Sequence, residues 1–372
     1  MEILISFIIP FIILLTVVVF VHEYGHYYYA KKYGVGVTDF SIGFGKEIFG
    51  FNDKSGMRWK FCLIPLGGYV KFFGDRNVFS YAEQAEILKK YSATDQKKLF
   101  LTKPIYQRSI ILAAGPVANF ILAIVIFTLL NMFVGKDFTP AQIKEVQKDG
   151  PAYVAGIKAG DVIKSIDNKK IQSLLEVAPI INTSTGDDIK MVVLRDNNEM
   201  SFNLQINKIE GTDAFGNKAN RKIIGIILSP LDGKINKQRL GPTKAIFYAV
   251  KETWFVIHAN WDFVVSAFKG KADIDQLGGP IKIAKISGDV AKLGLIPFLT
   301  IMAYISISIG FINLLPIPLL DGGHLAFNLF EKILKRPLSK KVQDGFFRIG
   351  LFLLLSLMFF TTFKDLKDLG LF

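Results

Sequence analysis

The chain has 372 residues, of which 45 are Lys or Arg and 32 are Asp or Glu, so its formal net charge is +13. Hydrophobic residues make up 51% and the mean hydropathy is +0.35, which excludes a disordered or fibrous chain. The single cysteine, Cys62, excludes a scaffold held by disulfides. So many apolar side chains beside 21% charged residues predict long apolar blocks, and therefore a membrane protein.

Four stretches of the sequence lack Asp, Glu, Lys and Arg, and each predicts a transmembrane helix. They are Ile3–Val21, Ser109–Val134, Leu293–Leu320 and Ile349–Phe363. About 20 helical residues cross the roughly 30 Å hydrocarbon core, so the first three blocks suffice and Phe346 and Phe347 extend the fourth. The first block is not typical of a cleaved signal peptide, because it lacks a basic leading segment and a small-residue cleavage site.

Basic residues near the ends of the blocks predict the orientation in the membrane. Residues 31–108 contain 14 Lys and Arg against 7 Asp and Glu, and residues 322–348 contain 6 against 2. Positively charged loops face the cytoplasm, and four spans place these two loops on the same side. We therefore expect both termini, and the long segment 135–292, on the outer side.

The cytoplasmic end of the first block carries His22-Glu23-Tyr24-Gly25-His26, an H-E-x-x-H motif. Residues i and i+4 of a helix share a face, so His22 and His26 can bind one zinc ion while Glu23 acts as the general base of a peptidase. Matches to so short a motif also arise by chance. The position favours a functional site, because charged side chains at membrane depth cost about 3 kcal/mol each.

A catalytic zinc ion needs a third protein ligand, and Asp321 is the leading candidate. It follows the third block, and the predicted orientation places it at the same membrane face as the H-E-x-x-H motif. The nearby His324 could be a fourth ligand, a donor to the transition state or a residue at the start of a helix, and the last interpretation is favoured.

Four segments of the chain carry signatures of a known family. They are residues 22–35, which begin with the H-E-x-x-H motif, 64–71 (Ile-Pro-Leu-Gly-Gly-Tyr-Val-Lys), 113–120 (Ala-Ala-Gly-Pro-Val-Ala-Asn-Phe) and 313–324 (Asn-Leu-Leu-Pro-Ile-Pro-Leu-Leu-Asp-Gly-Gly-His). They resemble the site-2 protease family, in its RseP-like bacterial branch. The resemblance implies an intramembrane zinc metalloprotease that cleaves transmembrane helices, with His22, His26 and Asp321 as ligands and Glu23 as base. It also implies that Asn313 holds the substrate backbone or the oxyanion, although a polar residue there could simply end a helix.

The same resemblance implies a membrane-dipping β element between the first two spans. Phe40–Phe51 and Trp59–Tyr69 are apolar, rich in β-forming residues and bounded by turn residues, as strands are. An edge strand beside the zinc could pair with an unwound substrate. Gly67 and Gly68 are then expected to bend this edge and bind the substrate, while an ordinary hairpin is the alternative.

Residues 150–163 resemble the opening of a PDZ domain, a fold that binds chain ends by strand addition. Alternating patterns predict strands at Ile163–Ile166, Ile189–Arg195 and Ser201–Ile206. We place this periplasmic domain at 138–230. In the family it is regarded as a sieve that admits substrates whose outer domain has been removed. Many relatives carry two such domains, whereas this sequence contains one such opening.

The predicted architecture is an α-helical membrane protein with four transmembrane helices and a membrane-associated β element, plus an α+β PDZ domain inserted between spans two and three. The N-terminal half of the membrane domain covers 1–135, with span one at 3–28, a β-rich cytoplasmic loop at 31–103 and span two at 106–134. An amphipathic membrane-surface segment at 240–292 follows the PDZ domain. Residues 293–372 form the C-terminal half with spans three and four.

Two other functions remain open at this point. A membrane-anchored zincin that acts outside the bilayer would share the H-E-x-x-H motif, but it usually takes His or Glu as third ligand. A catalytically inactive PDZ-bearing membrane scaffold would not need the four polar residues His22, Glu23, His26 and Asp321. Transport explains neither the motif nor the outer domain.

The expected cofactor is Zn²⁺, and the expected partners follow from the resemblance. They are the lipid bilayer, single-span membrane proteins such as anti-sigma factors or remnant signal peptides, and a peptide or chain end at the PDZ domain. Nucleic acid is not expected, because the positive charge is spread over the loops that set the topology. The absence of a transit peptide favours a bacterial inner membrane.

Overall fold

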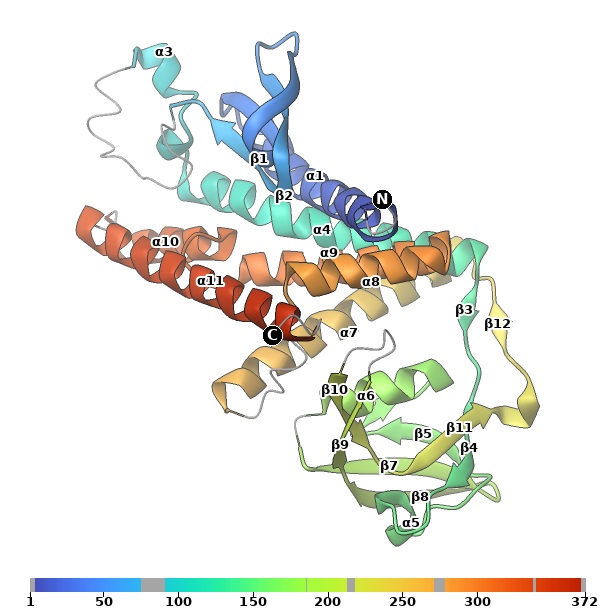
Figure 1. The fold of residues 1–372 in the computed structure, drawn as a ribbon. Coiled ribbons are helices and arrows are strands. Elements are labelled where there is room, and N and C mark those ends of the chain that lie inside the picture. The colour runs from blue at the N-terminus through green and yellow to red at the C-terminus, as the bar shows by residue number, and fades with distance from the viewer. Residues whose placement is uncertain are drawn as a thin grey trace. The chain divides into compact units, whose positions relative to one another are not determined.

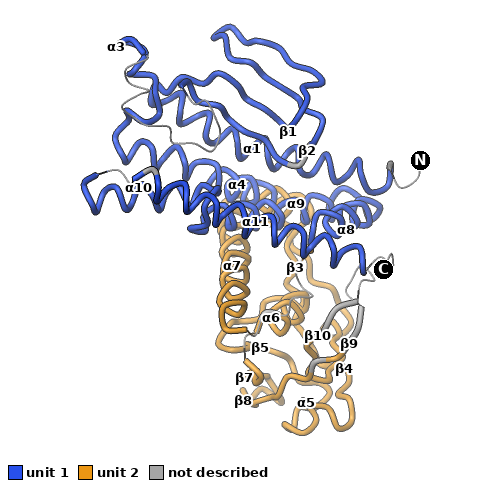
Figure 2. The backbone as a smooth tube through the Cα atoms, turned by 60° about the vertical axis from the view of Figure 1, so that its left-hand side comes forward, with its two compact units in different colours: residues 1–126, 279–370, 372 blue, residues 127–278, 371 orange. Residues whose placement is uncertain are grey.

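The computed structural model describes residues 4–74, 91–184, 186–212, 218–270, 278–336 and 339–368. Its backbone forms two compact units, which Figure 2 shows in different colours. Residues 1–126 and 279–370 form the membrane unit, and residues 127–278 form the sheet unit. The sheet unit is therefore an insertion between the two halves of the membrane unit.

Four helices in the described ranges are long and apolar enough to cross a bilayer (Figure 1). They cover Ile5–Lys32, Ile105–Phe133, Leu295–Leu314 and Lys341–Lys367. These segments correspond to α1 (Ile9–Lys32, preceded by the π-helical turn η1 at Leu4–Ile8), α4 (Ile105–Phe133), α9 (Leu295–Leu314) and α11 (Lys340–Asp368). The prediction of four long apolar helices is confirmed.

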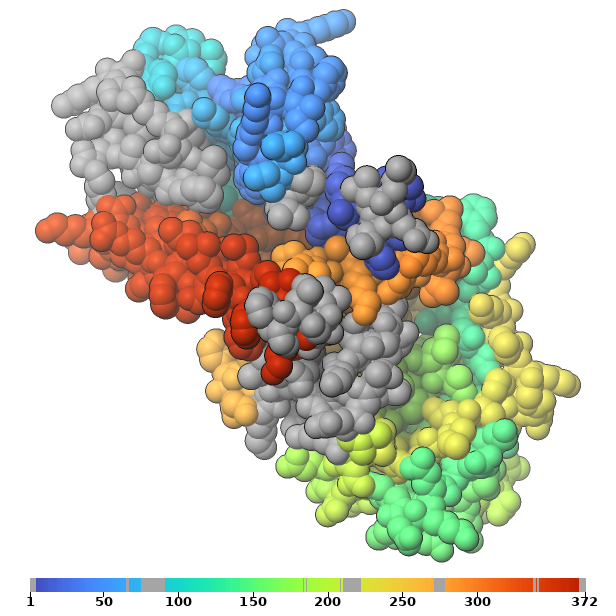
Figure 3. Space-filling model, viewed as in Figure 1, coloured from blue at the N-terminus to red at the C-terminus, as the bar shows by residue number. Residues whose placement is uncertain are grey.

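The helix α11 presents apolar side chains on its surface, as a helix that faces lipid does. Phe352 is 70% exposed and Phe359 is 75% exposed. Figure 3 shows α11 in red along one face of the protein. Soluble proteins rarely leave an apolar stripe of this size open, so the exposure supports a membrane-embedded helix.

The third apolar block is not one continuous helix. The helix α9 ends at Leu314, residues 315–320 are non-helical, and α10 runs over Asp321–Leu334. Pro316 and Pro318 lack the N–H group that a continuing helix needs, and their rings disfavour helical backbone in the preceding residues. The predicted block therefore covers a helical span and a loop, and the break places Asp321 at the start of a new helix.

Two long antiparallel strands, β1 (Val37–Asn52) and β2 (Arg58–Phe72), lie between α1 and α4. They agree with the strands predicted in this region. Residues 39–42 of β1 pair with residues 68–71 of β2 on one side and with residues 58–61 on the other. The two strands therefore pair with each other in more than one register, rather than as a simple two-stranded hairpin. The short helices α3 (Ala93–Gln96) and η2 (Phe100–Thr102) precede α4.

The sheet unit is built on a six-stranded sheet with the order β11-β4-β5-β7-β8, in which β6 pairs with β5. The strands of this unit are β3 (Lys136–Asp137), β4 (Ala141–Val146), β5 (Val162–Ile166), β6 (Lys169–Lys170), β7 (Asp188–Arg195), β8 (Asn198–Gln205), β9 (Asn207–Thr212), β10 (Lys218–Ile223), β11 (Ile226–Pro230) and β12 (Lys237–Gln238). Its helices are α5 (Pro151–Val154), η3 (Leu174–Glu176), α6 (Val177–Thr183), η4 (Leu231–Gly233) and α7 (Pro242–Phe268). The strands β5, β7 and β8 confirm the three strand predictions for this region.

An apolar core and a buried ion pair stabilise the sheet unit. Ile163, Met191 and other apolar side chains of the sheet pack against α6. Asp161, only 1% exposed, accepts hydrogen bonds of 2.7 and 2.8 Å from the guanidinium of Arg195 in β7. This pair ties the turn before β5 to β7.

The segment predicted at 240–292 is divided between the two units. Its first part forms α7 in the sheet unit, and its last part forms α8 (Pro280–Lys292) in the membrane unit. The helix α7 ends at Phe268, and α8 begins at Pro280, a residue that is favoured in the first turn of a helix. The helix α8 packs on η1, where a Cβ at Gly288 would meet Phe7. The described residues of 240–292 thus form two helices, and the membrane-surface location of this segment stays a prediction.

Candidate metal centre

Two buried imidazoles project from the same face of α1. His22 is 8% exposed and His26 is 7% exposed, and their Nε2 atoms lie 3.2 Å apart. A spacing of four residues in a helix produces this pairing, as the motif predicts. The Nδ1 atom of His26 donates a hydrogen bond of 2.8 Å to the carbonyl oxygen of Ile111 in α4. That bond leaves the lone pair of His26 Nε2 facing His22.

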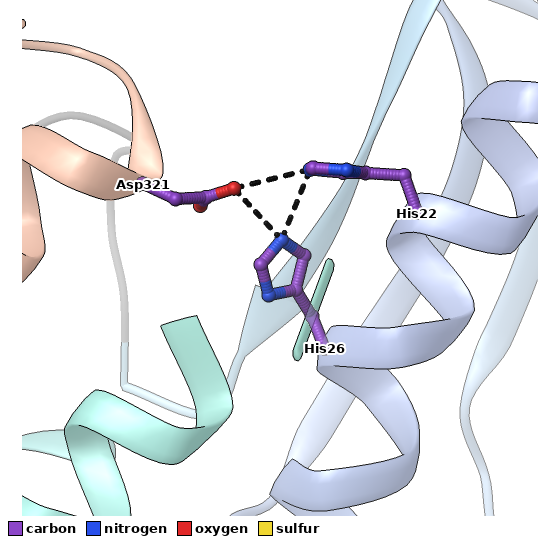
Figure 4. Close-up of side chains that lie close together, drawn as sticks. All are labelled: His22, His26 and Asp321. Atoms are coloured by element: carbon purple, nitrogen blue, oxygen red, sulfur yellow. Dashed lines mark hydrogen bonds and ion pairs between the residues drawn. The ribbon is translucent and has the colours of Figure 1, made fainter. Parts of the chain in front are cut away.

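The third atom of the cluster comes from Asp321, in the first turn of α10. Its Oδ2 lies 3.1 Å from His22 Nε2 and 3.4 Å from His26 Nε2 (Figure 4). In a tetrahedral zinc site with bonds of 2.0–2.1 Å, neighbouring ligand atoms lie about 3.3 Å apart. Two imidazole nitrogens and one carboxylate oxygen, nearly equidistant from one another and buried, therefore fit a zinc ion with a fourth position left over.

A glycine of α4 forms one wall of this cluster. A Cβ atom built on Gly115 would lie 2.9 Å from His22 Nε2 and would collide with His26 Nε2. The helices α1 and α4 also approach closely at Gly25, where a Cβ would meet the carbonyl group of Ala114. Glycine at position 115 thus leaves open the space beside the ligand atoms.

Hydrogen bonds between α4 and α10 fix the helix that carries Asp321. The buried Arg108 donates a hydrogen bond of 2.7 Å to Glu331, and Asn328 donates one of 3.1 Å to Ser109. Glu331 and Asn328 both belong to α10, in the turns that follow Asp321. They tie the third candidate ligand to the same helix that contacts the two histidines.

The β element contacts Glu23, the residue predicted to act as base. The backbone N–H of Val70 in β2 donates a hydrogen bond to the Glu23 carboxylate. A Cβ on Gly68 would lie 3.2 Å from Glu23 Cγ and 2.8 Å from Val19. Because only glycine fits between β2 and α1 at this point, the strand can approach the motif helix closely.

The remaining predicted residues have the following positions in the fold. Gly67 has a φ of 147°, and a Cβ on it would collide with the ring of Phe44. Asn313 lies partly buried in the last turn of α9. The ring of His324, in the first turn of α10, lies 5.7 Å from the ring of Phe347, so it packs between α10 and α11.

Sequence reasoning assigned no role to Gly115, Asn119 or Arg108. The resemblance covered residues 113–120 as a segment, but it did not say which of them approach the histidines. Gly115 and Asn119 are four residues apart and therefore share one face of α4. That spacing was the available signal, yet it identifies a shared face and not what the face contacts.

The four apolar helices and the buried three-atom cluster indicate a multi-pass membrane protein with a candidate metal centre. The sequence model of peptidase family M50 matches residues 10–357 of the chain, and the protein belongs to that family. It is a zinc metalloprotease.

The relatives carry corresponding names and match almost end to end. A protein of Mesorhizobium japonicum named as a zinc metalloprotease is 42% identical over 358 residues, covering 96% of this chain and 98% of its own. One of Agrobacterium fabrum with the same kind of name is 39% identical over 364 residues, covering 98% and 96%. Metalloprotease MmpA of Caulobacter vibrioides is 35% identical over 385 residues, covering 98% and 96%.

Among solved structures, the PDZ domain of the SdrC-like protein from Listeria monocytogenes covers 24% of this chain and 88% of its own, with 24% identity and a TM-score of 0.20. A likeness this low does not establish the fold of any part of the chain.

Proposed function

We propose that this metalloprotease cleaves peptide bonds within or next to transmembrane segments, with His22, His26 and Asp321 as zinc ligands and Glu23 as the general base. The observation that carries the proposal is the position of the cluster. Both histidines lie inside the apolar helix Ile5–Lys32, and the carboxylate lies just beyond the end of another such helix. A site built at the ends of membrane helices suits a substrate that is itself in the membrane.

Different residues around the cluster are proposed to act in different steps of peptide hydrolysis. Bound zinc supplies a Lewis acid that polarises the scissile carbonyl and acidifies a water molecule. Glu23 accepts the proton of the attacking water and returns it to the leaving amine. The hydrogen bond from the backbone N–H of Val70 is proposed to orient the carboxylate of Glu23. Asn313 is proposed to hold the substrate backbone or the oxyanion.

The β element is proposed to hold the substrate in an extended form. A helix hides its carbonyl groups in internal hydrogen bonds, so a transmembrane substrate must unwind before a peptide bond can be attacked. Residues 68–71 pair with residues 39–42 along one side, which leaves them as an edge of this hairpin. An unwound substrate can add to such an edge. Gly67 and Gly68 are proposed to bring that edge to the catalytic helix.

The sheet unit is proposed to contain a PDZ domain at 138–230 that faces the periplasm and limits access to substrates already trimmed. Its strand-and-helix composition and the glycine-containing turns around α5 support this proposal. Substrates are proposed to be single-span proteins of the anti-sigma factor or remnant signal peptide type. The basic loops support an inner-membrane orientation with both termini outside.

The test is cleavage of a single-span reporter by the purified protein in detergent, together with its zinc content. Glu23→Gln is expected to retain zinc and to reduce cleavage by about 1,000-fold, because it removes the base. Asp321→Ala is expected to lose zinc. An unfolded soluble protein serves as the comparison substrate. Cleavage of the soluble substrate alone would contradict the intramembrane proposal, and full activity of Glu23→Gln would contradict the assigned base.

A further inference from the structure

Asn119 is a fully buried polar residue of α4 that contacts one of the two histidines. It is 0% exposed, and its Nδ2 atom lies 3.3 Å from Nδ1 of His22. Its backbone oxygen accepts a hydrogen bond of 2.9 Å from the hydroxyl of Ser306 in α9. The residue is therefore held between α1 and α9, with its carboxamide directed at the rear of the His22 ring.

The two histidines of the cluster differ in what holds their Nδ1 atoms. His26 faces the carbonyl oxygen of Ile111, which can only accept a hydrogen bond, so its Nδ1 must carry the proton. The neutral imidazole then has a lone pair on Nε2, the atom that faces Asp321. The backbone of α4 thus determines the tautomer of His26.

His22 instead faces a carboxamide, which offers either an acceptor or a donor. With Nδ2 toward the ring, Asn119 donates to Nδ1, and the neutral ring then carries its proton on Nε2, where a metal would have to bind. In that orientation the buried Oδ1 of Asn119 has no hydrogen-bond partner. Exchanging the two ends of the amide preserves its shape and turns Oδ1 toward His22.

We propose that Asn119 is a positioning residue for zinc, which presents its Oδ1 to the Nδ1–H group of His22 and so keeps the His22 Nε2 lone pair available. This inference rests on the proposed assignment of His22 as a ligand. Histidine ligands almost always donate their other N–H to an oxygen acceptor, and Asn119 is the buried side chain beside His22 Nδ1. Asn119 thus gives the Nδ1–H group of His22 a hydrogen-bond acceptor, as the carbonyl oxygen of Ile111 does for His26.

The experiment compares the zinc affinity of five purified proteins, among them the wild type and His22→Ala, by competition with a chelator. Asn119→Leu removes the acceptor while retaining the approximate volume, and is expected to weaken zinc binding between about tenfold and 100-fold. Asn119→Asp retains an oxygen acceptor and is expected to stay within about threefold of the wild type, since carboxylates serve zinc-binding histidines in the same way. Asn131→Leu, at a partly buried asparagine twelve residues further along α4, is the control and is expected to stay within about threefold of the wild type.

Three outcomes would overturn the inference: unchanged zinc affinity of Asn119→Leu, an equal loss in Asn131→Leu, or an Asn119→Asp protein as weak as Asn119→Leu. If Asn119→Leu does not fold, ¹⁵N NMR of the histidine rings in the zinc-loaded wild type decides. A His22 ring protonated on Nδ1 supports the inference, and one protonated on Nε2 overturns it. Loss of zinc in His22→Ala but not in Asn119→Leu would reject the role of Asn119 alone, whereas retention of zinc in His22→Ala would reject the ligand assignment itself.

Discussion

The proposed ligands are held in two different ways. His22 and His26 share one helix, so their spacing survives almost any rearrangement that leaves α1 intact. Asp321 belongs to α10, about 300 residues further along the chain, and reaches them only through contacts between helices. The comparison indicates that a motif on one element can be local and robust, whereas the third ligand depends on how α10 is held against α4.

Among changes that leave every proposed ligand in place, the largest effect on the metal centre is expected from crowding it directly. Gly115→Ala places a methyl group against both imidazoles, and the rings must shift to admit it. Because overpacking costs up to about 3 kcal/mol, zinc affinity should fall about 100-fold. The measurement is chelator competition on the purified protein. Gly345→Ala is the matched control, because a Cβ there meets no atom within 4 Å. Equal zinc affinity in the two variants would contradict the geometry of the cluster.

A smaller effect is expected from loosening the helix that carries Asp321. Glu331→Gln removes the charge of the partner of buried Arg108 but retains a hydrogen-bonding group. A less firmly held α10 should weaken zinc binding about tenfold, as the loss of an outer contact of a metal site does. Asp344→Asn removes the same charge from an exposed position of α11 and serves as the control. If the two variants bind zinc alike, the Arg108 contact does not position Asp321.

No effect on zinc is expected from a comparable break in the sheet unit. Arg195→Met leaves Asp161 buried without its ion-pair partner, which should cost about 3 kcal/mol in that unit. Amide hydrogen exchange in β5 and β7 should report this loss, while zinc affinity stays at the wild-type value. Reduced zinc affinity in this variant would show that the metal centre depends on the sheet unit.

Several sequence predictions succeeded because local chemistry dictated them. The apolar blocks formed helices, and the alternating segments formed β5, β7 and β8. The exact ends of the elements were harder to predict. The block Leu293–Leu320 contains no charge, so composition alone did not show that its helix ends before Pro316 and Pro318. The segment 240–292 likewise gave no sign that its two helices belong to different units.

The amino-acid sequence was enough to predict the four apolar helices, the H-E-x-x-H pair on one helical face and the identity of the candidate acid, because composition, helical period and charge bias act along the chain. The packing of the helices was needed to establish that Asp321 meets both histidines, that Gly115 leaves room beside them, and that Asn119 faces His22. These are contacts between helices distant in sequence. They depend on close packing of α1, α4 and α10, which a residue's own neighbours in the chain do not encode.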